Sequence, residues 1–340
     1  MKKLKIKVKY LILAVIVVVL MLGYVVPKTI LAKAKRLEEE NELKSLECYK
    51  TYASMMSLSK DQEAFYKLGK STLPTIGTYD LFFWFKGSKD DITVPEIIDE
   101  ATDYYKIVLK GSEKNQYYPL AYKELLHIYT SMAEVDKAQE LINKGLKSKN
   151  AEVVYISELY RAFYYYVDRQ FEKATEIVDK YLDKGIEKND LYYLKGHIHF
   201  AKGEYEEANK YYTMADKMRI PNYGENFFGT TKNNFRSQWV DEYVEISGDN
   251  KINGSVSFDG KGIPFVQIYL RESSKSSEIP NELYFVALTD SNGKFEIPGV
   301  EDGEYEIAVG VCKAYLFDKV YVDRSQNLVT VKGNTEYNFE

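Results

Sequence analysis

The spacing of apolar residues divides the chain into a long helical part and a shorter part built of strands. Between residues 61 and 220, apolar side chains recur every three or four positions, as they do on one face of an α-helix. After residue 251, short apolar runs alternate with polar residues and are separated by Gly-rich turns, a pattern typical of β-strands. We therefore expect helices at 61–220, a capping helix and linker at 221–250, and an all-β antiparallel sandwich at 251–340.

The helical part repeats itself. Ala174 and Ala208 are 34 residues apart and hold the same place in two similar segments, and Ala138 holds that place in a third. A period of this length is typical of stacked helix pairs, each of which buries its apolar face only against its neighbours. Gly196 stands where the two helices of a pair approach closely, and Gly203 stands at the turn between them.

These segments resemble the tetratricopeptide repeat (TPR) family. The last copy carries the resemblance best, through Gly196, Gly203, Tyr205, Ala208, Tyr212 and Ala215. An incomplete copy comes first, with Phe65, Leu68 and Gly69 in one helix and Ala101, Tyr105 and Val108 in the next, on either side of an insertion at 73–95. The resemblance implies an all-α TPR-like superhelix that binds a partner and performs no chemistry.

In this family, the first helix of each repeat lines a concave groove that binds a protein or peptide. The corresponding residues here are Tyr66, Lys70, Lys123, His127, Leu159, Phe163, Tyr166, Tyr193, His197 and Phe200. Such an aromatic lining with a few basic groups suits an extended apolar or aromatic peptide, or sugar rings stacked on the aromatic faces. The same rings could instead fill a tight superhelix or contact the C-terminal sandwich.

The strand-rich part resembles the carboxypeptidase regulatory-like domain, a transthyretin-like sandwich. Its turn residues carry the resemblance: Gly254, Gly262, Pro264, Gly293, Pro298, Gly299 and Gly303. The domain accompanies carboxypeptidases, but the sequence holds no zinc-peptidase catalytic domain. The resemblance therefore implies an accessory module.

The N-terminus combines a basic tail with an apolar run. Five lysines between residues 2 and 9 precede Tyr10–Val26, which is free of charge. A helix of this length rises about 25 Å, a little less than the ~30 Å hydrocarbon core of a bilayer. We expect residues 1–28 to be a cytoplasmic tail and a single-pass transmembrane anchor, with the rest of the chain extracytoplasmic. The alternative is a signal peptide cleaved near Ala32 and Ala34, which would give a secreted protein.

Two segments lie between the anchor and the complete repeats. Residues 29–60 have helical spacing and predict one amphipathic linker helix. The insertion at 73–95 contains bulky apolar residues that could either enter a membrane interface or pack against the repeat helices. These residues are Phe82, Phe83, Trp84 and Phe85.

Composition and charge exclude several functions. The net charge of −5 argues against nucleic acid, which needs a clustered basic surface. His197 and His199 are two positions apart and point to different faces of a helix, so we expect no metal site. Cys48 and Cys312, the two cysteines, lie in different parts of the chain and do not define a disulfide scaffold. The sequence lacks nucleophile and phosphate-loop motifs, so we expect neither an enzyme nor a cofactor.

These observations predict one transmembrane helix, a TPR-like superhelix and a C-terminal sandwich. The function that follows is a non-catalytic, membrane-anchored extracytoplasmic scaffold that binds a protein or peptide partner. One alternative is a glycan- or cell-wall-binding module with the sandwich as the reader. Another is a regulatory subunit of a separate membrane enzyme.

Overall fold

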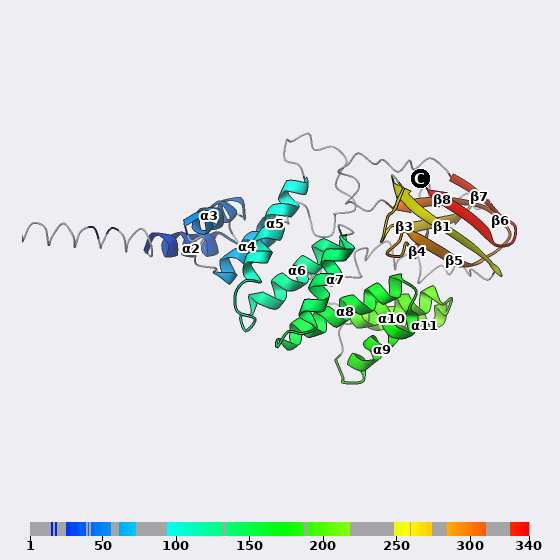
Figure 1. Cartoon of the computed structure of the whole chain (residues 1–340), viewed down its shortest axis with the longest axis horizontal. Helices are drawn as coiled ribbons and strands as arrows, with labels where there is room; N and C mark the ends of the chain where they lie inside the picture. Colours follow the sequence, from blue (N-terminus) through cyan, green and yellow to red (C-terminus); the bar gives the residue numbers. More distant parts are fainter. Residues whose placement is uncertain are drawn as a thin grey trace, which may run out of the picture. The chain divides into compact units, whose positions relative to one another are not determined.

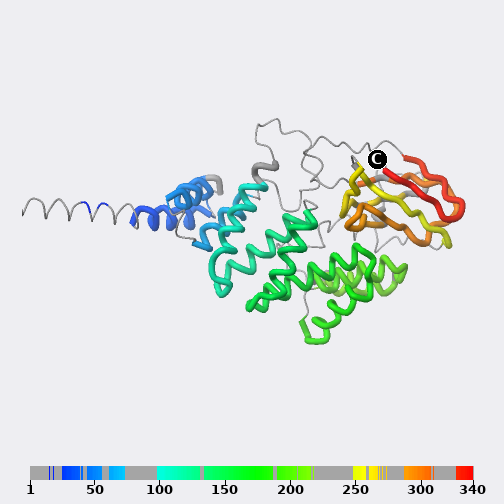
Figure 2. The backbone as a smooth tube through the Cα atoms, in the orientation of Figure 1, coloured from blue at the N-terminus to red at the C-terminus, as the bar shows by residue number. Residues whose placement is uncertain are grey.

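Figure 1 shows a computed structural model of the chain, and Figure 2 follows its backbone. The structure describes residues 15, 18, 25–38, 40, 42–55, 61–72, 94–131, 134–186, 189–217, 248–258, 260–273, 284–310 and 327–339. The chain forms two compact units, one of Met1–Thr78 with Lys89–Leu125 and the other of Tyr79–Ser88 with Leu126–Glu340.

Helices make up the described part of the first unit. They are α2 (Val26–Leu37), α3 (Glu42–Met55), α4 (Gln62–Thr72), α5 (Val94–Val108) and the beginning of α6 (Tyr117–Ser131). Helix α2 packs on α3, α3 on α4, and α4 on α5. The single linker helix predicted over 29–60 is therefore two helices. The chain turns after Leu37, whose carbonyl accepts a hydrogen bond from the Glu40 amide at 3.2 Å, and α3 then folds back on α2.

The structure corrects the predicted fold class at the N-terminus. Within the described residues, no helix has both the length and the apolar character needed to cross a membrane, so the transmembrane helix is not seen. Helix α2 begins at Val26 and carries Lys28, Lys33, Lys35 and Arg36, and these charges keep it from being such a helix. Of the apolar run that prompted the prediction, residues 10–14, 16, 17 and 19–24 lie outside the described residues.

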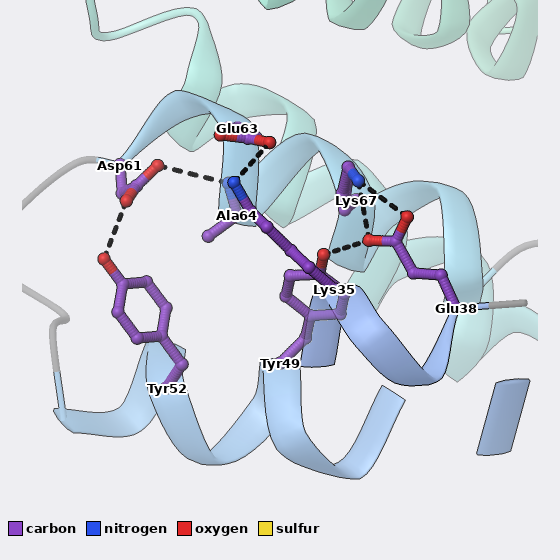
Figure 3. Close-up of polar contacts among 8 residues, drawn as sticks. All are labelled: Lys35, Glu38, Tyr49, Tyr52, Asp61, Glu63, Ala64 and Lys67. Atoms are coloured by element: carbon purple, nitrogen blue, oxygen red, sulfur yellow. Dashed lines mark hydrogen bonds and ion pairs between the residues drawn. The ribbon is translucent and has the colours of Figure 1, made fainter. Parts of the chain in front are cut away.

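A polar cluster joins α2, α3 and α4 (Figure 3). Glu38, just after α2, accepts hydrogen bonds from the Tyr49 hydroxyl and from Lys67 Nζ, the latter at 2.6 Å. Lys35 Nζ lies 2.7 Å from a carboxylate oxygen of Glu63. The cluster ties the hairpin of α2 and α3 to the first helix of the incomplete repeat.

Helices α4 and α5 are the pair predicted for the incomplete repeat. Gly69 on α4 lies directly under the ring of Tyr105, and a Cβ at this position would come within 2.7 Å of that ring. Ala101 and Leu68, both fully buried, belong to the same pair. The insertion of residues 73–93, with the four candidate membrane-interface aromatics, lies outside the described residues.

The described helices of the second unit follow one another in pairs. After the end of α6 come α7 (Val135–Gly145), α8 (Ala151–Val167), α9 (Phe171–Leu182), α10 (Asn189–Ala201) and α11 (Tyr205–Lys217). Each packs on the next from α7 to α11. Ala138, Ala174 and Ala208 are at most 1% exposed, as the repeat predicts for positions of close helix contact. Gly196 lies under the ring of Tyr212, where a Cβ would come within 2.6 Å.

Three helices of this unit end in the same way. Arg169 after α8, Gly185 after α9 and Gly203 after α10 all have a left-handed backbone, with φ of 58°, 69° and 78°. In each case the next amide donates to the carbonyl five residues back: Gln170 to Tyr165, Ile186 to Tyr181 and Glu204 to His199. Glycine is the usual residue at this place because it has no Cβ. Arg169 is the exception.

Strands form the rest of the described chain, which we call the β module (residues 248–339). They are β1 (Asn250–Phe258), β2 (Lys261–Gly262), β3 (Gln267–Glu272), β4 (Tyr284–Leu288), β5 (Lys294–Val300), β6 (Gly303–Gly310), β7 (Asn327–Val331) and β8 (Thr335–Phe339). One sheet has the order β2-β1-β5 with β8 beside β1, and the other has the order β4-β3-β6-β7. The predicted capping helix falls mostly in 218–247, outside the described residues.

Buried residues of both sheets form one hydrophobic core, which includes Ile252 and Ile297 from the first sheet and Ile268 and Ile307 from the second. The prediction of purely antiparallel strands is wrong, because β8 runs parallel to β1, with Ile252 opposite Thr335. The turn at Gly333, with φ 77°, carries the chain from β7 in one sheet to β8 in the other. The β8 strand therefore enters its sheet in the same direction as β1.

Candidate functional site

The predicted groove residues of the first unit differ in exposure. The ring of Tyr66 on α4 is buried, with centroids 6.0 Å from Tyr105 and 5.4 Å from Tyr117. Lys70 is exposed on the same helix, and Lys123 on α6 is half-buried. Tyr66 therefore contributes to packing, whereas the two lysines lie at the surface.

The structure brings most of the other predicted residues together between α8 and α10. Tyr166 stacks on His197 at 5.9 Å, and Phe163 lies 6.2 Å from Tyr166. Tyr193 lies 6.4 Å from the ring of Tyr212 on α11. The predicted residues in these contacts are all less than 10% exposed and pack inside the array: Leu159, Phe163, Tyr166, Tyr193 and His197. Half-buried groove residues in this unit are Phe200 on α10 and His127 on α6.

A hydrogen bond fixes this aromatic cluster. The Tyr212 hydroxyl lies 2.8 Å from His197 Nδ1. Burial raises the pKa of Tyr166, and burial together with the neighbouring Tyr166 and Tyr193 raises the pKa of Tyr212. Both tyrosines therefore remain neutral at physiological pH, as an apolar packing role requires.

Residues of the β module meet α8 at its C-terminal half. The ring of Phe265 lies 5.9 Å from Phe163 and stands edge-on to Tyr164 at 5.4 Å and 89°. Phe265 is 8% exposed but is not part of the core that the two sheets share. The two α8 rings that it contacts explain its burial. Burial likewise raises the pKa of Tyr164 to about 12, although the hydrogen bond to Thr130 opposes the shift.

Two consecutive residues at the end of α8 make the polar part of this contact. Arg169 Nη2 lies 2.5 Å from a carboxylate oxygen of Glu296 on β5. Arg169 Nη1 also lies 3.5 Å from the main-chain carbonyl of Glu296. The Asp168 carboxylate accepts a hydrogen bond from the Ser291 amide at 3.1 Å. A charge pair and a main-chain bond therefore flank the ring contact.

A small cleft lies beside the contact. Phe171 and Phe200 line it from the helices, and Ala287, Leu288 and Pro298 line it from the β module. Its volume of about 30 Å³ holds one or two water molecules but no larger ligand.

Sequence reasoning did not find Asp168, Arg169, Phe265 and Glu296. For Arg169 a signal was available, because one repeat period later the same place holds Gly203. An arginine at a turn whose left-handed backbone favours glycine indicates that the arginine side chain makes a contact that glycine could not make. That the groove rings could contact the C-terminal strands was one expectation from the sequence, but which residue makes the contact, Phe265, depends on tertiary structure.

The described part of the chain holds no candidate metal site. Among the described residues, no three His, Cys, Asp or Glu side chains form a group that could hold a metal ion. Cys48 on α3 is a free thiol, and Cys312 lies outside the described residues.

Comparisons with known proteins agree with the helical repeats. No known family model matches the chain. A TPR repeat-containing protein of Methanocaldococcus jannaschii is 33% identical over 127 residues, which are 36% of this chain and 20% of that protein. The chain thus spans about a fifth of the length of this relative. Together with the packed helix pairs, this similarity supports a helical array of the TPR type.

The chain is also similar to parts of solved helical-repeat structures. A TPR protein from Parabacteroides merdae has 18% identity and a TM-score of 0.38, over 60% of this chain and 70% of that one. A human IFIT1 dimer with PPP-AAAA has 14% identity and a TM-score of 0.31, over 54% and 46%.

Proposed function

We propose that the chain is a non-catalytic scaffold that binds a protein or peptide partner through its TPR-type array. The observation that supports this proposal most is the array itself, with packed helix pairs and similarity to a TPR repeat protein. Repeats of this kind present an extended surface made of many first helices. A surface of this kind suits the recognition of another chain.

The accessible part of the predicted groove gives the proposal its chemistry. Lys123 and His127 are four residues apart on α6 and so lie on one face of that helix. A partner that offers carboxylates is complementary to this pair of basic side chains.

The test is partner capture by the full chain from cells that produce it, followed by affinity measurement with the purified partner. The double variant Lys123→Glu with His127→Glu should weaken binding by about tenfold or more, because reversing charge at an interface opposes association. Lys144→Glu reverses one charge at an exposed position of α7, a second helix, and should leave binding unchanged. Equal affinity of the double variant and the wild type would refute the groove assignment.

The proposal includes a location outside the cytoplasm, because a basic tail before an apolar run is also the pattern of an export signal. Protease added to intact cells should then remove a tag placed at the C-terminus, while a cytoplasmic marker survives. Retention of the full chain on purified cell-wall glycan, without any protein partner, would instead favour the glycan-binding alternative.

A further inference from the structure

Two residues other than glycine have a left-handed backbone in the described part of the chain, Arg169 with φ 58° and Phe265 with φ 60°. Such a conformation brings the Cβ close to the main chain and persists where the surrounding structure imposes it. Both residues lie in the same contact, that of α8 with the β module. Strain on both sides of one contact is the observation from which we start.

Arg169 occupies a turn that suits glycine. The equivalent turns after α9 and α10 have the same hydrogen bonds and hold Gly185 and Gly203. Glycine would satisfy the main chain after α8 equally well. The side chain that stands there instead reaches Glu296.

The turn that carries Phe265 is held by four hydrogen bonds between Thr289, a fully buried residue, and Ile263, Phe265 and Val266. The Thr289 carbonyl accepts from the Phe265 amide at 3.1 Å, and the Thr289 amide donates to Val266 at 3.0 Å. The Thr289 hydroxyl donates to the Ile263 carbonyl at 2.7 Å and accepts from the Val266 amide at 2.8 Å. The β module therefore fixes this turn by itself, and the ring of Phe265 packs against α8 and not in the core of the module.

We propose that the β module is a ligand of the array within the same chain. Phe265 and Glu296 occupy an acceptor surface that we define as Phe163, Tyr164 and Arg169, and Asp168 anchors the Ser291 amide beside it. Phe163 belongs to the predicted groove. A partner that uses it has to displace the module and to bring the same two groups, an aromatic side chain and a carboxylate. This last clause rests on the proposed function, whereas the docking itself does not.

Two glycine substitutions in the full chain test the docking. Arg169→Gly and Phe265→Gly each remove a contacting side chain, and each suits the local backbone better than the native residue. The Ser291 amide is the reporter, because the acceptor of its hydrogen bond is Asp168 on the array. We expect hydrogen exchange at Ser291 to become about tenfold faster or more in both variants. Exchange in β1 should not change, since the core of the module is intact.

Lys251 provides a matched control. Its Nζ lies 3.4 Å from the same Glu296 oxygen that Arg169 binds, but it belongs to the β module. Lys251→Ala should leave exchange at Ser291 unchanged. In a charge exchange, Arg169→Glu and Glu296→Arg should each speed exchange, and the double variant should restore much of the protection.

Unchanged exchange at Ser291 in both glycine variants, with a higher melting temperature from relieved strain, would overturn the proposal. Partner capture is measured separately. Phe265→Gly should capture about threefold more partner than the wild type, because the acceptor surface is open. Faster exchange without greater capture would leave the docking standing and refute the competition with a partner. Failure of the α6 variants to weaken capture would refute the groove assignment without touching the docking.

Discussion

The contact among α2, α3 and α4 in the first unit and the contact among α8, α10 and the β module in the second are built from different groups. The first includes a cluster of charged groups and a tyrosine hydroxyl, in which Glu38 binds both Lys67 and Tyr49 (Figure 3). Aromatic rings dominate the second, where Tyr166 and Phe163 lie between α10 and Phe265. Partly exposed ion pairs fix geometry but add little stability, whereas buried rings contribute through the area that they remove from water. The two regions should therefore respond differently to volume changes and to salt.

The largest expected effect is loss of stability in alkali. Burial raises the pKa of Tyr166 and Tyr212 in the folded chain, whereas both ionise near the ordinary value of about 10 when unfolded. Above that pH the unfolded state binds fewer protons than the folded state, so stability falls as pH rises. With both rings still protonated in the folded chain, these two groups alone account for a loss of about 2.7 kcal/mol per pH unit. Urea unfolding at a series of pH values above about 9 measures it.

Tyr212→Phe is the control for the alkaline prediction. It removes one of the two titrating groups, so the loss per pH unit should be smaller by about 1.4 kcal/mol. At neutral pH the same variant should cost about 1–3 kcal/mol, since His197 loses its hydrogen-bond partner Tyr212. A slope identical to that of the wild type would contradict the prediction.

The next effect concerns a feature found in both units, a helical glycine that lies against a tyrosine ring. Gly69→Ala and Gly196→Ala each place a Cβ within 2.7 Å of a tyrosine ring, Tyr105 or Tyr212. We expect each change to cost about 1–3 kcal/mol, the usual range for overpacking. Gly203→Ala meets no atom within 4 Å but keeps φ at 78°, so its cost of about 1–2 kcal/mol comes from the backbone.

Thermal unfolding of these variants separates the two causes. Shortening the ring side chain, as in Gly196→Ala with Tyr212→Leu, should recover part of the loss at Gly196. No change of this kind should help Gly203→Ala. If Gly69→Ala and Gly196→Ala have the same melting temperature as the wild type, the helices are not in the close contact described.

The smallest effect concerns salt. Lys67→Gln removes the charge that binds Glu38, and its cost should be at most about 1 kcal/mol and should shrink at high salt. The stacking of Tyr166 on His197 should be indifferent to salt. Hydrogen exchange in α3 and in α10, compared at about 0.05 and 1 M NaCl, checks both. Equal salt dependence in the two helices would remove the distinction between the regions.

The repeat helices were predictable because each copy needs small residues at the same positions, where its helices approach closely. Small residues at Ala138, Ala174 and Ala208 and the close approach at Gly196 are written in the sequence at fixed spacing, and the structure has them as expected. Alternation of apolar and polar residues likewise indicated the strands after residue 251. The repeat period and the alternation of apolar and polar residues do not show which strand pairs with which. The parallel pairing of β8 with β1 was therefore missed.

The candidate site was less predictable for the same reason. The resemblance left two places open for Phe163 and Tyr166, a groove that binds a partner or a packed interior beside the sandwich, and the sequence did not decide between them. In the structure both rings are buried, and Phe163 contacts Phe265. The position of Phe265 depends on hydrogen bonds to Thr289, which no local pattern reveals. At the N-terminus, a basic tail and an uncharged run at Tyr10–Val26 predicted a membrane helix, but no described helix has the length and apolar character to cross a membrane.

The parallel pairing of β8 with β1 sets an order on the synthesis of this protein. Thr335, the β8 residue opposite Ile252, follows it by 83 residues. The first sheet therefore stays incomplete for roughly 4–16 s of translation at typical ribosome speeds. The helices from α7 to α11 rely on neighbours close in sequence and can close as they emerge. The nascent chain should therefore display Phe163 and Arg169 uncovered for several seconds before Phe265 can be presented by a finished module. A chaperone or partner that binds aromatic surfaces has its first opportunity in that interval.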